Sequence, residues 1–178
     1  MVVIAISGPP GSGKTTQAKK IVEYLGLRYF SAGKVFREIA REKGLSIEEL
    51  SILAAKDPSI DLEIDRRTYM EALKGDVVLD GHLTAWIVKD IADIKVYLTA
   101  PLIVRVERIA KRDNIDFYTA LKQTIIREYM QWKRYIDYYG IDVNDLSIFD
   151  LVIDVEKIGI EEVFEIIKSY IEKSLKSK

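Results

Sequence analysis

The glycine-rich segment at residues 8–15 constrains the fold more than any other part of the sequence. It reads Gly-Pro-Pro-Gly-Ser-Gly-Lys-Thr, follows an apolar run at residues 2–6 and opens a segment of helical periodicity at residues 14–25. Glycines between a strand and a helix let the backbone wrap around an oxyanion, which then faces the helix N-terminus. A turn that binds nothing would not need Lys followed by Thr. The pattern therefore predicts a nucleoside triphosphate cradle.

The same pattern predicts how the nucleotide is held. We expect Lys14 to bridge the β- and γ-phosphates and the Thr15 hydroxyl to ligate Mg²⁺, the cofactor that the motif implies. Asp80 ends the apolar strand at residues 77–79 and is the expected acidic partner of the ion, although an aspartate in this position can also be a simple turn former. The residues expected to bind ATP through the motif are Gly8, Pro9, Pro10, Gly11, Ser12, Gly13, Lys14, Thr15 and Thr16.

Strand-like and helical segments alternate along the chain, which predicts a doubly wound α/β sheet. Several consecutive helical segments between residues 34 and 73 interrupt that alternation, and an insertion there can form a substrate-binding subdomain. The expected strands are residues 2–6, 77–79, 94–98 and 151–153, with 28–31 as a fifth. The expected helices are residues 14–25, 34–43, 46–56, 60–73, 102–112, 118–138 and 160–175.

Composition narrows the class of protein. A chain of 178 residues with 48% hydrophobic content is the size of one domain, and a net charge of −1 gives no overall field for nucleic acid or an anionic membrane. The absence of cysteine and the single His82 exclude disulfides and thiolate or histidine-cluster metal sites. No run approaches the ~20 apolar residues of a membrane span, and residues 2–6 are too short for a secretory signal. We expect a cytoplasmic protein that is a monomer, since no apolar surface stripe is evident.

Arginines supply candidates for a second phosphate site. Transfer between two phosphates needs more cations than the glycine-rich segment provides. Arg127 and Arg134 are seven residues apart in a helical segment and project from one face, while Arg108 and Arg112 are separated by one turn. A solvated surface stripe is the alternative for each pair, because lysines are interspersed among them.

An ordered set of short motifs resembles the nucleoside monophosphate kinases, and most closely the cytidylate kinases of the archaeal type. The motifs run along nearly the whole chain: residues 8–15, Ser-Ala-Gly-Lys-Val-Phe-Arg at 31–37, residues 60–67, Asp-Gly at 80–81, Ala-Trp at 85–86 and residues 139–147. The resemblance implies a P-loop NTPase fold with a five-stranded parallel sheet flanked by helices. It divides the single domain 1–178 into a core (1–33, 74–110 and 128–178), an acceptor-binding insertion (about 34–73) and a short lid (about 111–127).

The resemblance also implies an activity, the transfer of the γ-phosphoryl group of ATP to CMP and dCMP. Arg37 would bind the acceptor phosphate, Arg66 would reach the same phosphate or the cytosine, and Arg108 would lie against the adenine of ATP. The implied acceptor site is Ser31, Gly33, Arg37, Arg66, Gly81 and His82. The implied catalytic residues are Lys14, Arg112, Arg127 and Arg134.

His82 departs from the family pattern, because many cytidylate kinases have Arg after the strand-end Asp-Gly. A histidine can donate or accept a hydrogen bond and need not be charged at pH 7, or it can be purely structural. The acceptor therefore stays open between CMP, dCMP, UMP, AMP and a small metabolite such as shikimate. A P-loop ATPase or nucleotide-driven switch is the alternative from another class.

Overall fold

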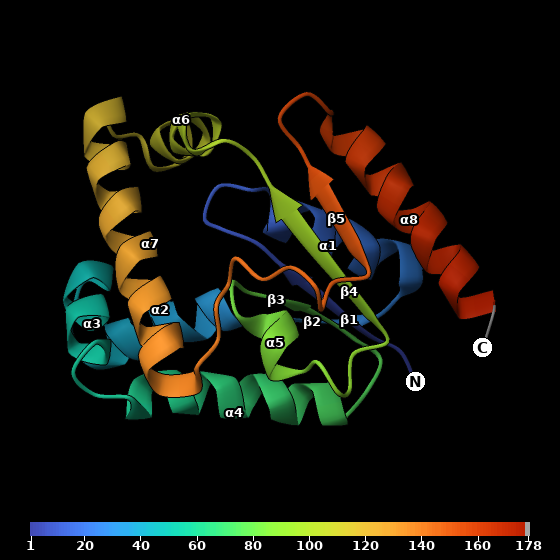
Figure 1. Ribbon diagram of the computed structural model, residues 1–178, viewed down its shortest axis with the longest axis horizontal. Coiled ribbons are helices and arrows are strands. Elements are labelled where there is room, and N and C mark those ends of the chain that lie inside the picture. The colour runs from blue at the N-terminus through green and yellow to red at the C-terminus, as the bar shows by residue number, and fades with distance from the viewer. Residues whose placement is uncertain (177–178) are drawn as a thin grey trace.

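One parallel sheet forms the centre of the protein. The computed structural model describes residues 1–176, and its five strands are hydrogen-bonded in the order β2-β3-β1-β4-β5 (Figure 1). The strands are β1 (Val3–Ser7), β2 (Arg28–Ser31), β3 (Val77–Asp80), β4 (Ile94–Thr99) and β5 (Leu151–Asp154). All four neighbouring pairs are parallel, so the predicted doubly wound α/β sheet is confirmed, including its fifth strand.

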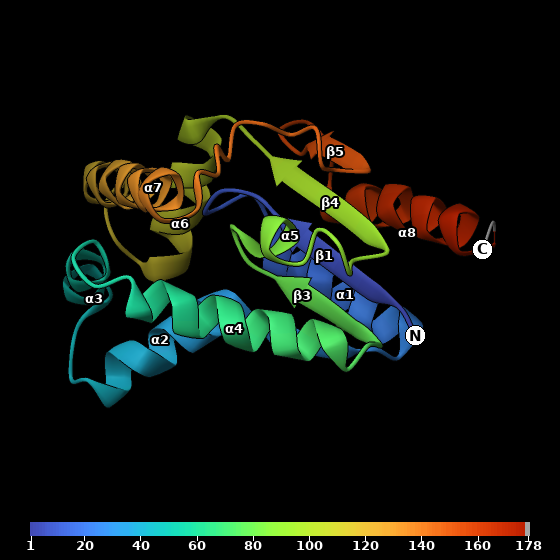
Figure 2. The same cartoon turned by 60° about the horizontal axis from the view of Figure 1, so that its bottom comes forward.

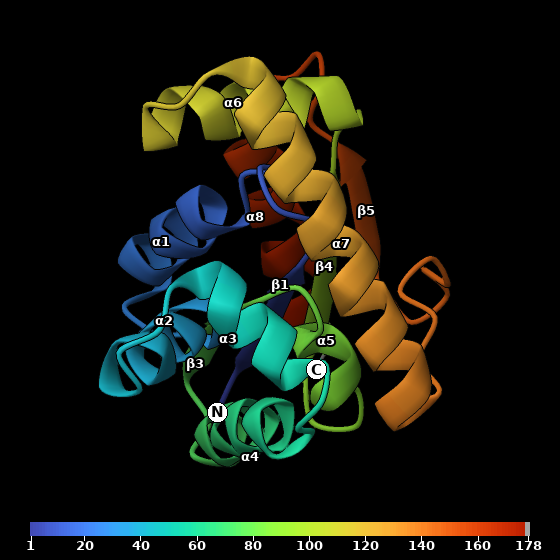
Figure 3. The same cartoon turned by 90° about the vertical axis from the view of Figure 1, so that its left-hand side faces the viewer.

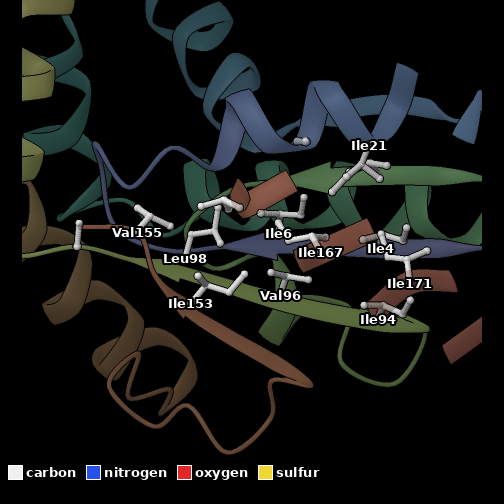
Figure 4. Packing of buried hydrophobic residues seen from close by; sticks show 14 residues of the cluster. Ile4, Ile6, Ile21, Ile94, Val96, Leu98, Ile153, Val155, Ile167 and Ile171 are labelled. Carbon is white, nitrogen blue, oxygen red and sulfur yellow. The ribbon is translucent and has the colours of Figure 1, made fainter. Parts of the chain in front are cut away.

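Helices cover both faces of this sheet. On one face α1 (Lys14–Leu25) and α8 (Ile160–Lys176) pack their isoleucines against β1, β4 and β5, as Figure 4 shows for Ile21, Ile167 and Ile171. On the other face α4 (Ser59–Leu73) and the short α5 (Thr84–Ile87) close over β1 and β3 (Figure 2). The central strands are buried on both sides, which explains their continuous apolar sequences.

The inserted helices have a small core of their own. α2 (Ala32–Glu42) and α3 (Ile47–Ala54) pack with the start of α4 around Val35, Ile39, Leu50 and Ile64. This cluster lies beside the main sheet and faces α7 (Phe117–Tyr139), a long helix that crosses the molecule (Figure 3). The insertion therefore has a hydrophobic cluster of its own, separate from the clusters that flank the sheet.

Residues 111–127 do not form an element of their own. They comprise the end of α6 (Leu102–Asp113), a turn with Asn114 in the left-handed region (φ 53°), and the first half of α7. α6 and α7 pack together through Val106, Ile109 and Ala120. Any lid movement in this range therefore has to involve the α6–α7 hairpin.

Two further features complete the fold. α5 is not anticipated by the sequence, because four residues are too few to show a helical period. None of the helices within residues 1–176 combines the length and apolar character needed to cross a membrane.

The strand register matters most for function, because it pairs Asp80 with Ile6 on one side and Ser31 on the other. The carboxyl ends of β1, β2 and β3 thus meet at one edge of the sheet.

Candidate active site

The glycine-rich segment forms a tight loop at that edge. Gly8 (φ 148°) and Gly11 (φ 78°) adopt backbone conformations that L side chains rarely take, and a Cβ on Gly8 would overlap the carbonyl oxygen of Leu98. Gly13 (φ 86°) precedes α1 without any side-chain cap. The first N–H groups of the helix therefore face out of the loop without a capping side chain, as an anion site requires.

Lys14 occupies the cationic position of this loop. Its Nζ donates a 3.0 Å hydrogen bond to the carbonyl oxygen of Pro9. The pKa of Lys14 is lowered to about 8, chiefly by burial and in addition by the positive charges of Arg127 and Arg105, although Asp80 acts in the opposite direction. The ammonium group is thus short of compensating negative charge, and a phosphate would supply it.

The residues expected to hold Mg²⁺ are together and fit the ion. Oδ2 of Asp80 accepts hydrogen bonds from Thr15 Oγ1 (2.6 Å) and from the Tyr29 hydroxyl (2.8 Å). A hydroxyl and a carboxylate are the hard oxygen donors that Mg²⁺ prefers. Across residues 1–176 no cluster of three or more His, Cys, Asp or Glu side chains could hold a metal. The donor set therefore suits an ion that takes its remaining ligands from phosphates and water.

Three of the residues expected at the acceptor site also lie together. Ser31 ends β2 and caps α2, since its hydroxyl accepts a 3.3 Å bond from the Lys34 N–H. A Cβ built on Gly33 would lie 3.6 Å from Nη1 of Arg37 and 3.8 Å from the Ser31 hydroxyl oxygen. The Arg37 guanidinium therefore reaches back over the first turn of α2, and its charge contributes to lowering the pKa of Arg127.

Gly81 and His82 follow directly after Asp80. A Cβ on Gly81 would lie 2.2 Å from the Thr84 hydroxyl oxygen and 2.9 Å from the Cβ of Ala32, so any larger residue would force these neighbours to shift. His82 Nδ1 lies 3.2 Å from Oε1 of Gln131 on α7. The pKa of His82 is lowered to about 3, chiefly by burial and in addition by the charge of Lys14. His82 is therefore neutral at pH 7 and acts as a hydrogen-bonding group rather than a cation.

Arg127 and Arg112 bring positive charge to the same region. Burial lowers the pKa of Arg127, and the charges of Arg112 and Arg37 add to that effect. The charges of Arg127 and Arg112 in turn depress the pKa of Lys14. Arg112 is 62% exposed and pairs with Asp113 at 2.7 Å. These cations repel one another, and a multiply charged anion bound in this region would relieve that repulsion.

Arg108 and Arg66 lie in different surroundings. Nη2 of Arg108 donates a 3.0 Å bond to the carbonyl oxygen of Val155, just beyond β5 and at the carboxyl edge of the sheet. Arg66 is 67% exposed and pairs with Glu63 of its own helix at 3.0 Å. The structure therefore places Arg108 near the loop that follows β5, and it directs Arg66 toward solvent.

Arg134 is buried in an ion pair with Asp61 rather than open to the P-loop. Its Nε donates a 2.7 Å bond to Oδ2 of Asp61, and Nη2 lies 3.4 Å from Oδ1. Nη1 is buried and has no hydrogen-bond partner among residues 1–176. One donor of this guanidinium thus remains available within the protein interior.

Sequence reasoning missed several residues that shape the site. Tyr29 bonds Asp80, and its two-residue spacing from Ser31 on one strand was a signal, since alternate residues share a face. Asp61 pairs with Arg134 across 73 positions, a separation that no local pattern reveals. Arg105 stands in a charged helical segment where its sequence context does not distinguish it from a surface residue, yet it is 7% exposed and contacts the P-loop.

An open cleft of about 430 Å³ lies beside the P-loop, between the end of β4 and α7. His82, Tyr129 and Trp132 are among its lining residues, together with the Arg105 and Glu128 side chains. Lys14 is not one of the lining residues, so the cleft borders the phosphate cradle without containing it.

The parallel sheet with its P-loop, the Thr15–Asp80 pair and the surrounding cations define a P-loop kinase. A family model described as "AAA domain" matches residues 7–119. The cytidylate kinase of Staphylothermus marinus is 69% identical over 176 residues, covering 99% of both chains. That of Desulfurococcus amylolyticus is 61% identical and covers 100% of this chain and 97% of its own. The chain belongs to the cytidylate kinase family.

A solved structure supports the fold independently of close sequence likeness. The shikimate kinase of Bacteroides thetaiotaomicron superposes with a TM-score of 0.63 at 14% identity, covering 96% of this chain and 98% of that one. At this identity the likeness concerns only the P-loop kinase fold.

Proposed function

We propose that the protein transfers the γ-phosphoryl group of ATP to CMP, and to dCMP, forming CDP or dCDP and ADP. The observation that carries the proposal is the meeting of the P-loop with Ser31, Gly33 and Arg37 at one edge of the sheet. The family membership and the names of the relatives support CMP as the acceptor.

On the donor side, the backbone N–H groups of the P-loop and the Lys14 ammonium bind the β- and γ-phosphates. Thr15 and Asp80 would hold Mg²⁺, which when bound neutralises charge on the phosphate oxygens. Tyr29 holds the Asp80 carboxylate in place through its hydroxyl. Arg108, at the carboxyl edge near Val155, lies against the adenine ring.

On the acceptor side, Arg37 binds the CMP phosphate, with Ser31 and Gly33 lining its pocket. Arg127 and Arg112 neutralise the charge of the group in transfer. No general base is needed, because a nucleoside monophosphate is already an anion at neutral pH. Rate enhancement comes from alignment of the two phosphates and from preorganised cations.

Arg134, Arg66 and His82 complete the proposed acceptor site. The unpaired Nη1 of Arg134 donates to the acceptor when it is bound, while Asp61 holds the rest of the guanidinium. The neutral His82, together with Gly81, contacts the nucleotide by hydrogen bonding. Arg66 must exchange its Glu63 partner to reach the acceptor, so its role depends on movement of the insertion.

Closure of the 34–73 insertion and of the 111–127 lid over the two nucleotides excludes water, which would otherwise accept the phosphoryl group. CMP binds before MgATP or independently of it. We also propose that the protein is cytoplasmic and has no nucleic acid or membrane partners, since its net charge of −1 gives no overall field for either.

We propose a monomer, although the sequence-based reason for it is wrong. α7 exposes a stripe of large apolar side chains, among them Ile125, Tyr129, Trp132 and Ile136. Light scattering at micromolar concentration tests the oligomeric state, and a dimer would direct attention to this stripe.

The acceptor is tested with a panel. The purified protein is incubated with MgATP and one of CMP, dCMP, UMP, AMP, GMP or shikimate, and ADP and phosphorylated product are quantified. The proposal predicts the highest kcat/KM for CMP or dCMP. Preference for AMP or UMP would keep the kinase class and overturn the assignment of the base.

A further inference from the structure

Arg105 joins three parts of the protein through one buried guanidinium. It lies on α6 with 7% exposure. Nε donates a 2.9 Å bond to the carbonyl oxygen of Ala100 after β4, and Nη1 donates a 3.0 Å bond to that of Pro10 in the P-loop. Both terminal nitrogens also contact the carboxylate of Glu128 on α7. A buried charge is tolerated only when it is well satisfied, as this one is.

The bond to Pro10 bears on the phosphate cradle itself. In a trans peptide the C=O and the following N–H point in opposite directions. Holding the Pro10 carbonyl toward Arg105 therefore turns the Gly11 N–H away from Arg105. The contact is close, because a Cβ on Gly11 would lie 2.6 Å from the carbonyl oxygen of Arg105. Arg105 of α6 thus fixes the orientation of the Gly11 N–H, which is one hydrogen-bond donor of the P-loop.

The bond to Glu128 bears on the opposite wall of the site. Glu128 is the neighbour of Arg127 on α7, and the charge of Arg127 reaches Lys14 in the P-loop. The side chain of Arg105 is 8% exposed and that of Glu128 is 26% exposed, so solvent screens the pair only in part. An ion pair at this position restricts rotation of the turn of α7 from which the Arg127 side chain projects.

We propose that Arg105 is a positioning residue that couples the P-loop to Arg127. One arm of its guanidinium orients the Gly11 N–H toward the donor phosphates, and the other holds Glu128 so that Arg127 faces the group in transfer. The inference rests on the proposed phosphoryl transfer. Each arm has a separate effect. The Pro10 arm, the bond from Arg105 to the Pro10 carbonyl, governs ATP binding, and the Glu128 arm, the ion pair with Glu128, governs the chemical step.

Two variants separate these arms. Glu128→Gln removes the charge of the α7 partner and leaves both carbonyl bonds of Arg105 in place. We expect kcat with CMP to fall about 10- to 100-fold, as small misplacements of reacting groups do, while KM for ATP stays within about twofold. Arg105→Lys cannot reach all three acceptors, and we expect it to lower kcat and also weaken ATP binding about tenfold.

A control variant and a binding measurement test whether the effects are specific to the Arg105 contacts. Glu107→Gln removes an exposed carboxylate from the same helix and should leave kcat, KM and thermal stability unchanged. ATP affinity is measured by calorimetric titration without CMP, so the P-loop arm is tested even if wild-type protein fails to phosphorylate CMP and the proposed function falls. In the double variant, Arg105→Lys should make Glu128→Gln nearly silent.

The proposal is overturned if Glu128→Gln keeps wild-type kcat, or if Arg105→Lys keeps wild-type ATP affinity at temperatures where circular dichroism shows it folded. If Arg105→Lys does not fold, Glu128→Gln alone decides the α7 arm. Pro10→Ala, which keeps the carbonyl, and Pro10→Gly, which loosens it, then decide the other arm. Equal ATP affinity in Pro10→Ala and Pro10→Gly would contradict the role proposed for the Pro10 carbonyl bond.

Discussion

Asp61 on α4 and Arg134 on α7 form an ion pair whose side chains are only 8% and 4% exposed. The pair connects the insertion at residues 34–73, which we propose binds the acceptor, to the helix that also carries Arg127. Burial raises the pKa of Asp61, while Arg134 opposes that rise. This ion pair therefore joins the insertion to α7. Removal of either partner would leave the other charge buried without a counter-ion.

Removing one partner should be costly. Asp61→Asn leaves the Arg134 charge buried without its counter-ion, and we expect the free energy of unfolding to fall by about 3–5 kcal/mol. Chemical denaturation of wild type and variant measures the difference. Glu63→Gln is the matched control, because it breaks solvent-screened pairs on the same helix and should destabilise the protein far less. Equal losses in the two variants would show that Asp61–Arg134 is not a special link.

Lys14 should destabilise the protein in the absence of nucleotide. Its pKa is about 8 in the folded chain against 10.5 when unfolded, so between these values the unfolded state binds more protons and stability rises with pH. Lys14→Met removes the buried charge, and we expect a higher melting temperature than wild type at pH 7 together with loss of CMP phosphorylation. The difference in melting temperature should shrink by pH 10. A variant less stable than wild type at pH 7 would contradict this reading.

Asp65 should give stability the opposite dependence on pH. Its pKa is raised from 3.8 to about 7, chiefly by burial and in addition by the nearby Asp61 charge, while the Tyr139 hydroxyl at 2.5 Å and Arg134 oppose the rise. The folded state then binds more protons between pH 4 and 7, so stability falls as pH rises through that window. Asp65→Asn keeps an acceptor for Tyr139 and does not titrate. Its melting temperature should vary less between pH 4.5 and 7.5 than that of wild type, and parallel curves would disprove the assignment.

The two arginines proposed for the acceptor should differ in effect. Arg37 already lies over Gly33 at the proposed acceptor site, whereas Arg66 is 67% exposed and paired with Glu63. We expect Arg37→Ala to raise KM for CMP about 100-fold, the order expected when a charge-assisted bond to phosphate is lost, and to leave KM for ATP nearly unchanged. Arg66→Ala should raise KM for CMP less than tenfold. Steady-state kinetics decides the matter, and a larger rise in KM for CMP from Arg66→Ala than from Arg37→Ala would contradict the assignment of Arg37 as the main phosphate ligand.

Local sequence patterns predicted most of what local physics determines. The P-loop at residues 8–15, the five strands and the meeting of Thr15 with Asp80 follow from apolar runs, glycine spacing and the rule that parallel strands end at one edge. The four-residue α5 could not be seen, since it has no measurable period.

The unpredicted parts depend on contacts between distant segments. Arg105 and Arg134 occupy similar charged helical contexts in the sequence, and nothing local shows that each is buried against a carboxylate. The partners, Glu128 and Asp61, lie 23 and 73 positions away. Spacing along one helix predicts which residues share a face, but the neighbour that covers that face is set by the packing of other helices.

The most direct measurement follows the γ-phosphoryl group itself. Wild-type protein is incubated with ATP labelled in its γ-phosphate and with CMP, and the label is separated into CDP and inorganic phosphate, with Lys14→Met as the inactive control. Phosphoryl transfer at the proposed site predicts that the label appears in CDP, and only in reactions that contain CMP and wild-type protein. Label released as inorganic phosphate at the same rate with or without CMP would identify an ATPase and contradict the proposed function.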